Sequence, residues 1–156
     1  MKYFTLELLD KSCNMLDSEY EMYDKLWMEN LTAYWSQFKN YENRLPSRFV
    51  KEYCKHAFHD YNIEFINFYN DGTKKRDCYN VELKVSFDNN KFLIRYIGVT
   101  KYNINVNSLN YMQENTFLYS EILPIDNKKM SHEILFVDRN IVYIEFRKII
   151  FKKISK

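Results

Sequence analysis

The chain has 156 residues and a formal net charge of +2, with 46% apolar residues, 18% aromatic residues and only two glycines and two prolines. This composition is typical of one folded domain and excludes a disordered chain, and so small a charge does not by itself indicate a nucleic-acid partner. The charges are uneven, because residues 1–40 carry seven acids and four bases whereas residues 147–156 carry five bases and no acid. A basic end can attract phosphate or an acidic membrane, but we favour a solvated strand end whose lysines protect a sheet edge.

The cysteines and the apolar runs indicate where the protein works. Cys13, Cys54 and Cys78 are odd in number and form no Cys-x-x-Cys pair, which favours reduced thiols over a disulfide framework. The first residues, "MKYFTLELLDKSCN", have too short an apolar run for a signal peptide, and no run of 18 apolar residues follows. We therefore expect a soluble, cytoplasmic protein that does not act on membranes.

The first third of the chain is predicted to be helical. Residues 3–11 fit a short helix or a strand, and residues 17–39 fit a long helix with Asp17 or Ser18 as N-cap. The long helix has apolar residues at steps of three and four, which indicates one wide apolar stripe. The stripe comprises Leu16, Tyr20, Tyr23, Trp27, Leu31, Tyr34, Trp35 and Phe38. Most of it should face a core, although its rings could also form a contact surface for a partner.

A second helix is predicted in "NRLPSRFVKEYCKHAFHD", with Pro46 in its first turn and its end near His59–Asp60. The periodicity then changes to two. Strands are expected at 62–69, 79–87, 92–99, 101–107, 117–123, 132–137 and 141–151, with turns at Asp71–Gly72 and at "DRN". The prediction is one α+β domain over 1–156, in which the helices of 1–60 pack on an antiparallel six- or seven-stranded meander formed by 61–156.

The segment His56-x-x-His59-Asp60 is the most suggestive chemical pattern. On a helix His56 and His59 are neighbours, so they could share a metal, with a third ligand from Asp60, Cys54, Cys78 or His132. The closed set of four ligands typical of structural zinc is missing from the pattern. We interpret the segment as the joint between a helix and a strand, and we expect no metal and no cofactor. The alternative is a metal-dependent hydrolase that uses His56, His59, Asp60 and His132.

Other catalytic patterns are missing from the sequence. Cys54 and His56 are two residues apart on a helix, where side chains do not face each other, and no Gly-x-Ser-x-Gly occurs. Gly72 and Gly98 are the only glycines, which excludes a P-loop and a dinucleotide fingerprint. The glutamates of the predicted strands are interpreted as the polar face of a sheet, and the scattered bases do not predict a nucleic-acid surface.

Four segments, "MKYFTLELL", "HDYNI", "LYSEI" and "HEILFVDRNIVYIEFRKIIF", resemble an uncharacterised family of small Firmicute proteins classed as a domain of unknown function. The matching residues are His59 and Asp60, then Phe117, Leu118, Tyr119 and Glu121, then His132, Leu135 and Phe136. The chain departs from the family pattern at Tyr61, where a small residue is usual, and at Phe117, where Trp is usual. The resemblance implies no activity. It implies a cluster of His59, Asp60, Tyr119, Glu121 and His132, either as a hydrogen-bonded seam or as a binding pocket.

The function expected from these patterns is non-enzymatic protein binding, in the form of an immunity or toxin-neutralising partner in a bacterial cell. The candidate binding residues are Trp27, Trp35, Tyr119 and Glu121. The expected partner is another protein, not a nucleic acid or a membrane, and the oligomeric state is left open. A structural or assembly protein that pairs through a sheet edge is a further alternative.

Overall fold

The structure is a computed structural model that describes residues 1–13, 20–70, 79–105 and 116–154. The helices are α1 (Leu6–Cys13), α2 (Tyr20–Phe38), the 3-10 helix η2 (Glu42–Arg44) and α3 (Ser47–His56). The strands are β1 (Asn62–Asn70), β2 (Tyr79–Phe87), β3 (Asn90–Val99), β4 (Lys101–Asn105), β5 (Phe117–Pro124), β6 (Met130–Phe136), β7 (Ile141–Phe146) and β8 (Lys148–Ile154). The ambiguous segment at residues 3–11 is thus mainly helical, with Thr5 Oγ1 accepting a hydrogen bond from the Leu8 amide as an N-cap would.

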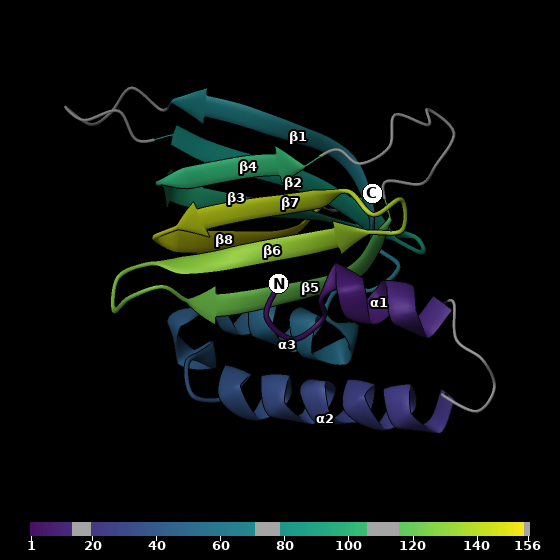
Figure 1. Cartoon of the computed structure of the whole chain (residues 1–156). Coiled ribbons are helices and arrows are strands. Elements are labelled where there is room, and N and C mark those ends of the chain that lie inside the picture. Colours follow the sequence, from purple (N-terminus) through teal and green to yellow (C-terminus); the bar gives the residue numbers. More distant parts are fainter. Residues whose placement is uncertain (14–19, 71–78, 106–115, 155–156) are drawn as a thin grey trace.

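The prediction of an α+β fold with antiparallel strands is confirmed, but the single meander is wrong. The described strands form two four-stranded antiparallel sheets, with orders β1-β2-β3-β8 and β4-β7-β6-β5. Figure 1 shows one sheet in front of the other, with α2 and α3 below both of them. The predicted N-cap at Asp17 or Ser18, the turn at Asp71–Gly72 and Cys78 lie outside the described residues.

A sharp corner divides the strand predicted at 141–151 into β7 and β8, which lie in different sheets. Beside this corner β3 passes into β4, and the Arg147 amide donates to the Ile97 carbonyl. Gly98 has φ +64°, and a Cβ there would lie 3.2 Å from Cδ of Arg147. Glycine therefore permits the bend where these two segments of the chain cross closely. A change in the alternation marks this corner along the chain. The buried residues of β7 have even numbers up to Phe146, whereas those of β8 have odd numbers from Ile149.

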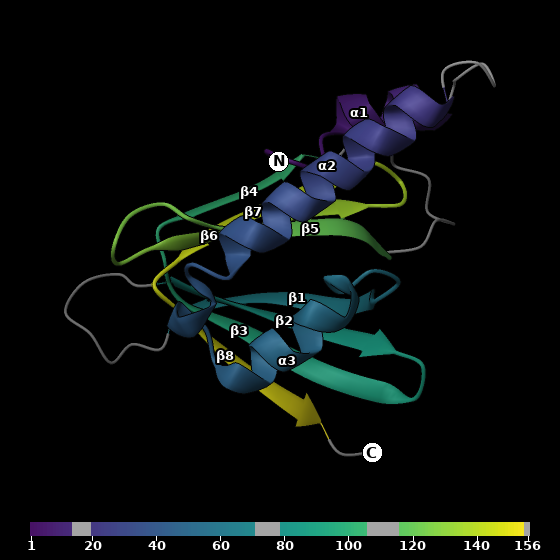
Figure 2. The same ribbon diagram turned by 90° about the horizontal axis from the view of Figure 1, so that it is seen from below.

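The helices close one side of the two-sheet sandwich by bonding to the edge of β5. In the view from below, α2 crosses the end of one sheet and α3 lies beside β8 of the other (Figure 2). Tyrosine hydroxyls from these helices and from the turn after α2 reach the outer backbone groups of β5. Tyr34 Oη accepts from the Ile122 amide at 2.9 Å, Tyr53 Oη donates to the Ser120 carbonyl at 2.9 Å, and Tyr41 Oη donates to the Ile122 carbonyl at 2.9 Å. An edge that would otherwise lie buried and unpaired is thereby satisfied.

Glu121 attaches the first residues of the chain to the same strand. Its carboxylate, only 1% exposed, accepts from the backbone amides of Lys2, Tyr3 and Phe4 at 2.7, 2.7 and 2.6 Å. Glu133, its partner across the β5–β6 pair, lies 2.5 Å from the Met1 amino group. Three amide donors stabilise a buried carboxylate that would otherwise be costly. This attachment places Phe4 against Trp27 and Tyr34 of α2.

The apolar stripe of α2 is only partly covered. Tyr34 and Phe38 are fully buried, but toward the start of the helix Tyr20 is 62% exposed. Met28, which the stripe did not include, is 50% exposed. The core receives the C-terminal half of the helix, so its N-terminal half keeps apolar surface in contact with solvent. No helix within the described ranges is long and apolar enough to cross a membrane.

Candidate functional site

A groove between α2, α3 and β5 gathers most of the residues singled out from the sequence. We call it the aromatic groove. It has a volume of about 350 Å³ and is lined by Phe4, Trp27, Leu31, Trp35, Cys54, Lys55, His56, Ala57, His59, Leu118, Tyr119 and Ser120. The candidates Trp27, Trp35, Tyr119, His56 and His59, which lie far apart in the sequence, therefore share one concavity.

Interlocking rings form one wall of the aromatic groove. Trp27 and Tyr119 have ring centroids 4.6 Å apart, and Phe4 packs 5.1 Å from Trp27 and 5.6 Å from Tyr119. Further along α2, Trp35 packs 5.7 Å from Tyr53, which is buried beneath it. Each ring is supported by another from a different segment, so this wall is preorganised for an apolar group.

The opposite rim is the end of α3, and the turn there is unusual. Ala57, Phe58 and Asp60 all have positive φ, at 50°, 60° and 66°. The Ala57 amide donates to Tyr53 as the left-handed cap of α3, and the Asp60 amide donates to the Phe117 carbonyl of β5. Non-glycine residues in this conformation cost free energy and persist only where the surroundings enforce it. The segment therefore is a joint between helix and sheet, as predicted, and it also forms a rim of the groove.

The two histidines of this rim have different surroundings. His59 Nδ1 lies 3.0 Å from Asp60 Oδ1, and its ring meets Tyr119 edge-on at 5.7 Å. His56 packs against Tyr61 and Phe87 at 5.5 and 5.0 Å, and its buried Nδ1 makes no hydrogen bond to any described residue. Two imidazoles thus edge the groove, one partly exposed beside the Asp60 carboxylate, the other partly covered by rings.

The remaining candidates lie elsewhere. His132 is fully buried between the sheets and helices, with Nδ1 2.6 Å from Tyr96 Oη, and burial lowers the pKa of its imidazole to about 3. Glu121 holds the first residues of the chain and does not line the groove. The cluster implied by the family resemblance thus forms only around His59, Asp60 and Tyr119.

The arrangement offers little for catalysis. Desolvation, with a smaller effect from the Glu42 carboxylate, raises the pKa of the Cys54 thiol, so at neutral pH this thiol is protonated and weakly nucleophilic. In the described part of the chain no three His, Cys, Asp or Glu side chains are grouped so that they could hold a metal ion. The lining residues that the sequence did not single out are Phe4, Lys55, Ala57 and Ser120, and Leu118 entered only through the family resemblance. Lys55 had a local signal, its place directly before His56.

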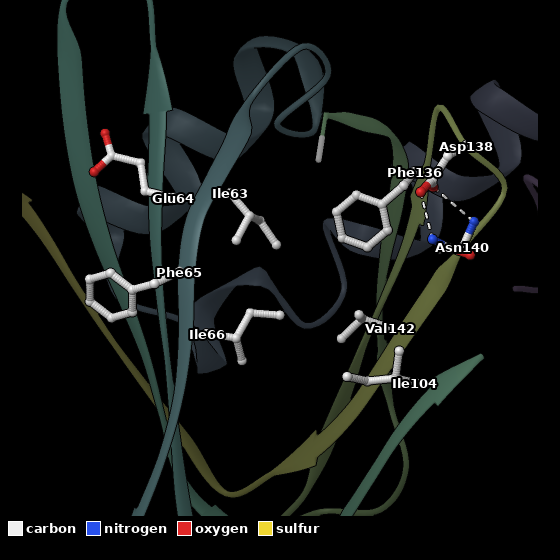
Figure 3. A pocket seen from close by; sticks show the side chains of 9 residues that line it. All are labelled: Ile63, Glu64, Phe65, Ile66, Ile104, Phe136, Asp138, Asn140 and Val142. Carbon is white, nitrogen blue, oxygen red and sulfur yellow. Dashed lines mark hydrogen bonds between the residues drawn. The ribbon is translucent and has the colours of Figure 1, made fainter. Parts of the chain in front are cut away.

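A second concavity, the open cleft, lies where the sheets part on the side away from the helices. It has a volume of about 240 Å³ and is lined by Ile63, Glu64, Phe65, Ile66, Ile104, Phe136, Asp138, Asn140 and Val142. Figure 3 shows Ile63 and Ile66 of β1 facing Phe136, Val142 and Ile104, whereas Glu64 and Phe65 point away. Asp138 accepts two hydrogen bonds from Asn140 at one end of the cleft. The cleft is apolar, with its polar groups already paired.

Comparison of the chain with protein-family models, with curated proteins and with solved structures finds no match. The resemblance to the Firmicute family therefore stays a prediction, and the function has to be argued from the geometry of this chain.

Proposed function

We propose that the protein is a non-catalytic binding module that holds an apolar side chain of a partner protein in the aromatic groove. The observation that carries the proposal is the convergence of both tryptophans of the chain, Trp27 and Trp35, with Tyr119 around one preformed concavity. Tryptophan and tyrosine dominate the binding energy of protein interfaces, where they line pockets for a partner's anchor residue.

The surface around the groove fits the same function. Met28 stands three residues before Leu31 and seven before Trp35, so it extends the groove-lining face of α2 into solvent. The exposed polar residues of that part of α2 are mostly acidic, with Glu21, Asp24 and Glu29 against Lys25. Such a surface favours a partner that surrounds its apolar anchor with basic residues. A bacterial toxin that the protein neutralises would be one such partner.

The test uses the two tryptophans as built-in reporters. Affinity capture from the source cell with the wild-type chain should retain a partner that Trp27→Ala and Met28→Glu both lose. Met28 is exposed, so its substitution leaves the fold intact even if Trp27→Ala weakens it. Tyr79→Ala, an exposed aromatic outside the groove, is the matched control and should retain the partner.

The captured partner should then be titrated into the wild-type chain. We expect a blue shift of tryptophan emission and protection from acrylamide quenching, and a loss of affinity of at least about tenfold for Met28→Glu. A partner retained equally by all variants, or one that leaves tryptophan quenching unchanged, would contradict the proposal.

A second candidate function, assembly through a sheet edge, is favoured by the open cleft. β1 and β4 are each an edge strand of one of the two sheets, and Phe68 of β1 and Ile104 of β4 are exposed large apolar side chains. Exposed apolar edges are sites of strand pairing between chains. Light scattering should then give a dimer mass for the wild type and a monomer mass for Ile104→Lys. A wild-type monomer at high concentration would remove this candidate.

A further inference from the structure

A third concavity, distinct from both the aromatic groove and the open cleft, lies between α3 and β8. We call it the cationic cleft. Arg48, Lys51 and Lys55 follow one another on α3 at steps of three and four, which places them on one face of the helix. They line a cavity of about 420 Å³ together with Lys153, which comes from β8. Four cations from two separate elements therefore converge on one cavity.

Most of this positive charge is uncompensated. Glu52 is the acid that lines the cleft, and its carboxylate is already engaged by Lys55 Nζ at 2.9 Å and by Tyr61 Oη at 2.7 Å. Arg48, Lys51 and Lys153 form no ion pair with any residue that the structure describes. Three exposed cations thus share a small space, an arrangement whose mutual repulsion an anion would relieve.

The floor of the cleft is aromatic and rigid. Phe92 and Phe151 stack with ring centroids 5.3 Å apart and an interplanar angle of 11°, and Phe49 meets Phe151 edge-on at 5.6 Å. Both floor residues are buried, so they present little surface to the cavity. An apolar floor below a ring of cations suits a ligand that joins an anionic group to a flat, apolar body.

Most of the positive charge on the opposite face of the same sheet is neutralised. There Lys84 and Lys91 both pair with Glu64, at 2.7 and 2.6 Å, and Arg95 pairs with Glu82 at 2.6 Å, whereas Lys148 and Lys152 of β8 are exposed. A polymer such as single-stranded nucleic acid needs a positive track that continues along its backbone. The ion pairs of Lys84, Lys91 and Arg95 interrupt such a track, and a volume of about 420 Å³ lies within the range of small-ligand sites.

We infer that the cationic cleft binds a small organic phosphate of nucleotide size. Arg48, Lys51 and Lys153 hold the phosphate, because a guanidinium and two ammonium groups match its multiple charge and its acceptor oxygens. The ring of the ligand lies against the floor formed by Phe92 and Phe151. The cleft shares only Lys55 with the aromatic groove, and Lys51 and Lys153 do not line that groove, so either site can fail without the other.

Calorimetric titration of the full chain at low salt tests this inference with adenosine monophosphate, inorganic phosphate and adenosine as probes. Adenosine monophosphate should bind most tightly, phosphate more weakly, and adenosine not measurably. Lys51→Gln and Lys153→Gln should each weaken binding of adenosine monophosphate by roughly tenfold, since each removes a charge-assisted hydrogen bond. Lys128→Gln removes an equal charge from the exposed β5–β6 turn and should leave binding unchanged.

Two further titrations separate the sources of phosphate. Single-stranded oligonucleotides of increasing length and vesicles containing phosphatidylglycerol should bind no more tightly per phosphate than adenosine monophosphate does. Affinity that rises steeply with oligonucleotide length, or binding only to vesicles, would overturn the inference in favour of a polyanion surface. Absence of binding to adenosine monophosphate, or equal binding by the wild type and both Gln variants, would overturn it outright. The substituted lysines are exposed, so unchanged thermal unfolding should confirm that the variants fold.

Discussion

Strands β5 and β4 are the two edges of one sheet, but they are completed in opposite ways. Tyrosine hydroxyls of α2 and α3 bond to the outer backbone groups of β5, and Glu121 of that strand holds the first residues of the chain. β4 borders the open cleft, where Ile104 is 44% exposed. The contrast shows that the buried polar contacts of this fold are concentrated on one side of the sandwich. Stability should therefore depend on the β5 side, which leaves the β4 side free to vary.

The largest loss of stability is expected from Glu121→Gln. The glutamine side chain has one acceptor oxygen, whereas three backbone N–H groups now bind the two oxygens of the carboxylate. Its NH₂ group would also face a backbone N–H, which is itself a donor. We expect the free energy of unfolding to fall by about 3 kcal/mol or more. Urea denaturation measures this change, and hydrogen exchange at residues 2–4 should accelerate. The control is Glu64→Gln, whose two lysine pairs lie on the outer sheet face and whose loss should be far smaller. Equal losses would remove the contrast between the two regions.

The pH dependence of stability should report on His132 of β6, which pairs with Ile122 of β5. Burial lowers the pKa of its imidazole to about 3, whereas in the unfolded chain the pKa is about 6.5. The unfolded state therefore binds a proton first as the pH falls, and stability is lost progressively between pH 6.5 and 3. At pH 5 the loss should be about 2 kcal/mol relative to neutral pH. His132→Gln should flatten this slope, and a slope that the variant leaves intact would assign it to other groups.

Tyr53→Phe tests the hydroxyl contacts to β5 alone. The change removes the bonds from Tyr53 Oη to the Ser120 carbonyl and to Tyr34 Oη, at 2.9 and 2.6 Å, without removing the ring. A buried carbonyl then loses its donor, so we expect a loss of about 2 kcal/mol in the free energy of unfolding. Tyr79→Phe is the matched control. Tyr79 is 56% exposed, so its substitution should leave the free energy of unfolding almost unchanged.

Ala57→Gly should have the opposite sign. Ala57 ends α3 with φ 50° and ψ 34°, a conformation that glycine adopts without a Cβ penalty. We expect a stabilisation of about 1 kcal/mol, whereas Ala33→Gly in the middle of α2 should destabilise by a similar amount. Thermal unfolding gives both values. If the strained turn also shapes the aromatic groove, the more stable Ala57→Gly chain should bind its partner less tightly, and unchanged affinity would separate the two roles.

The smallest effect is expected in the open cleft. Ile104→Thr removes an apolar group that is already half exposed, so the free energy of unfolding should change by no more than about 0.5 kcal/mol. Ile122→Thr, the same change at a fully buried position of β5, should cost about 2–3 kcal/mol because it buries a hydroxyl and leaves a void. A comparable loss at both positions would show that β4 contributes to stability as much as β5 does.

Much of the secondary structure was predictable, because each element has its own local pattern. β2 illustrates this, since Val81, Leu83 and Val85 alternate with polar residues in the sequence and are fully buried in the structure. The division into two sheets was not predicted. It depends on Gly98 and Arg147, which lie 49 positions apart in the sequence and meet at the corner. The sequence signal at Arg147–Lys148 is only a change of parity, which a single long strand with a bulge would produce as well.

The candidate site was predictable in its members but not in its shape. Trp27, Trp35, His56 and His59 were identified by residue type and helical spacing, and Tyr119 by the family resemblance. The structure places all five around the aromatic groove. Phe4 and Lys55 were missed as lining residues. Phe4 reaches the groove because a carboxylate more than a hundred residues away holds its backbone. No local pattern encodes a contact of that range.

The sequence by itself determined the kinds of element, their order, the faces they bury and the lack of a glycine-rich phosphate loop, because these follow from neighbouring residues. Only the tertiary structure decided which edges are covered and which cavities form. Those features depend on hydrogen bonds between distant residues, such as Tyr53 with Ser120 and Tyr3 with Glu121, and such bonds form only after the helices and both sheets have come together.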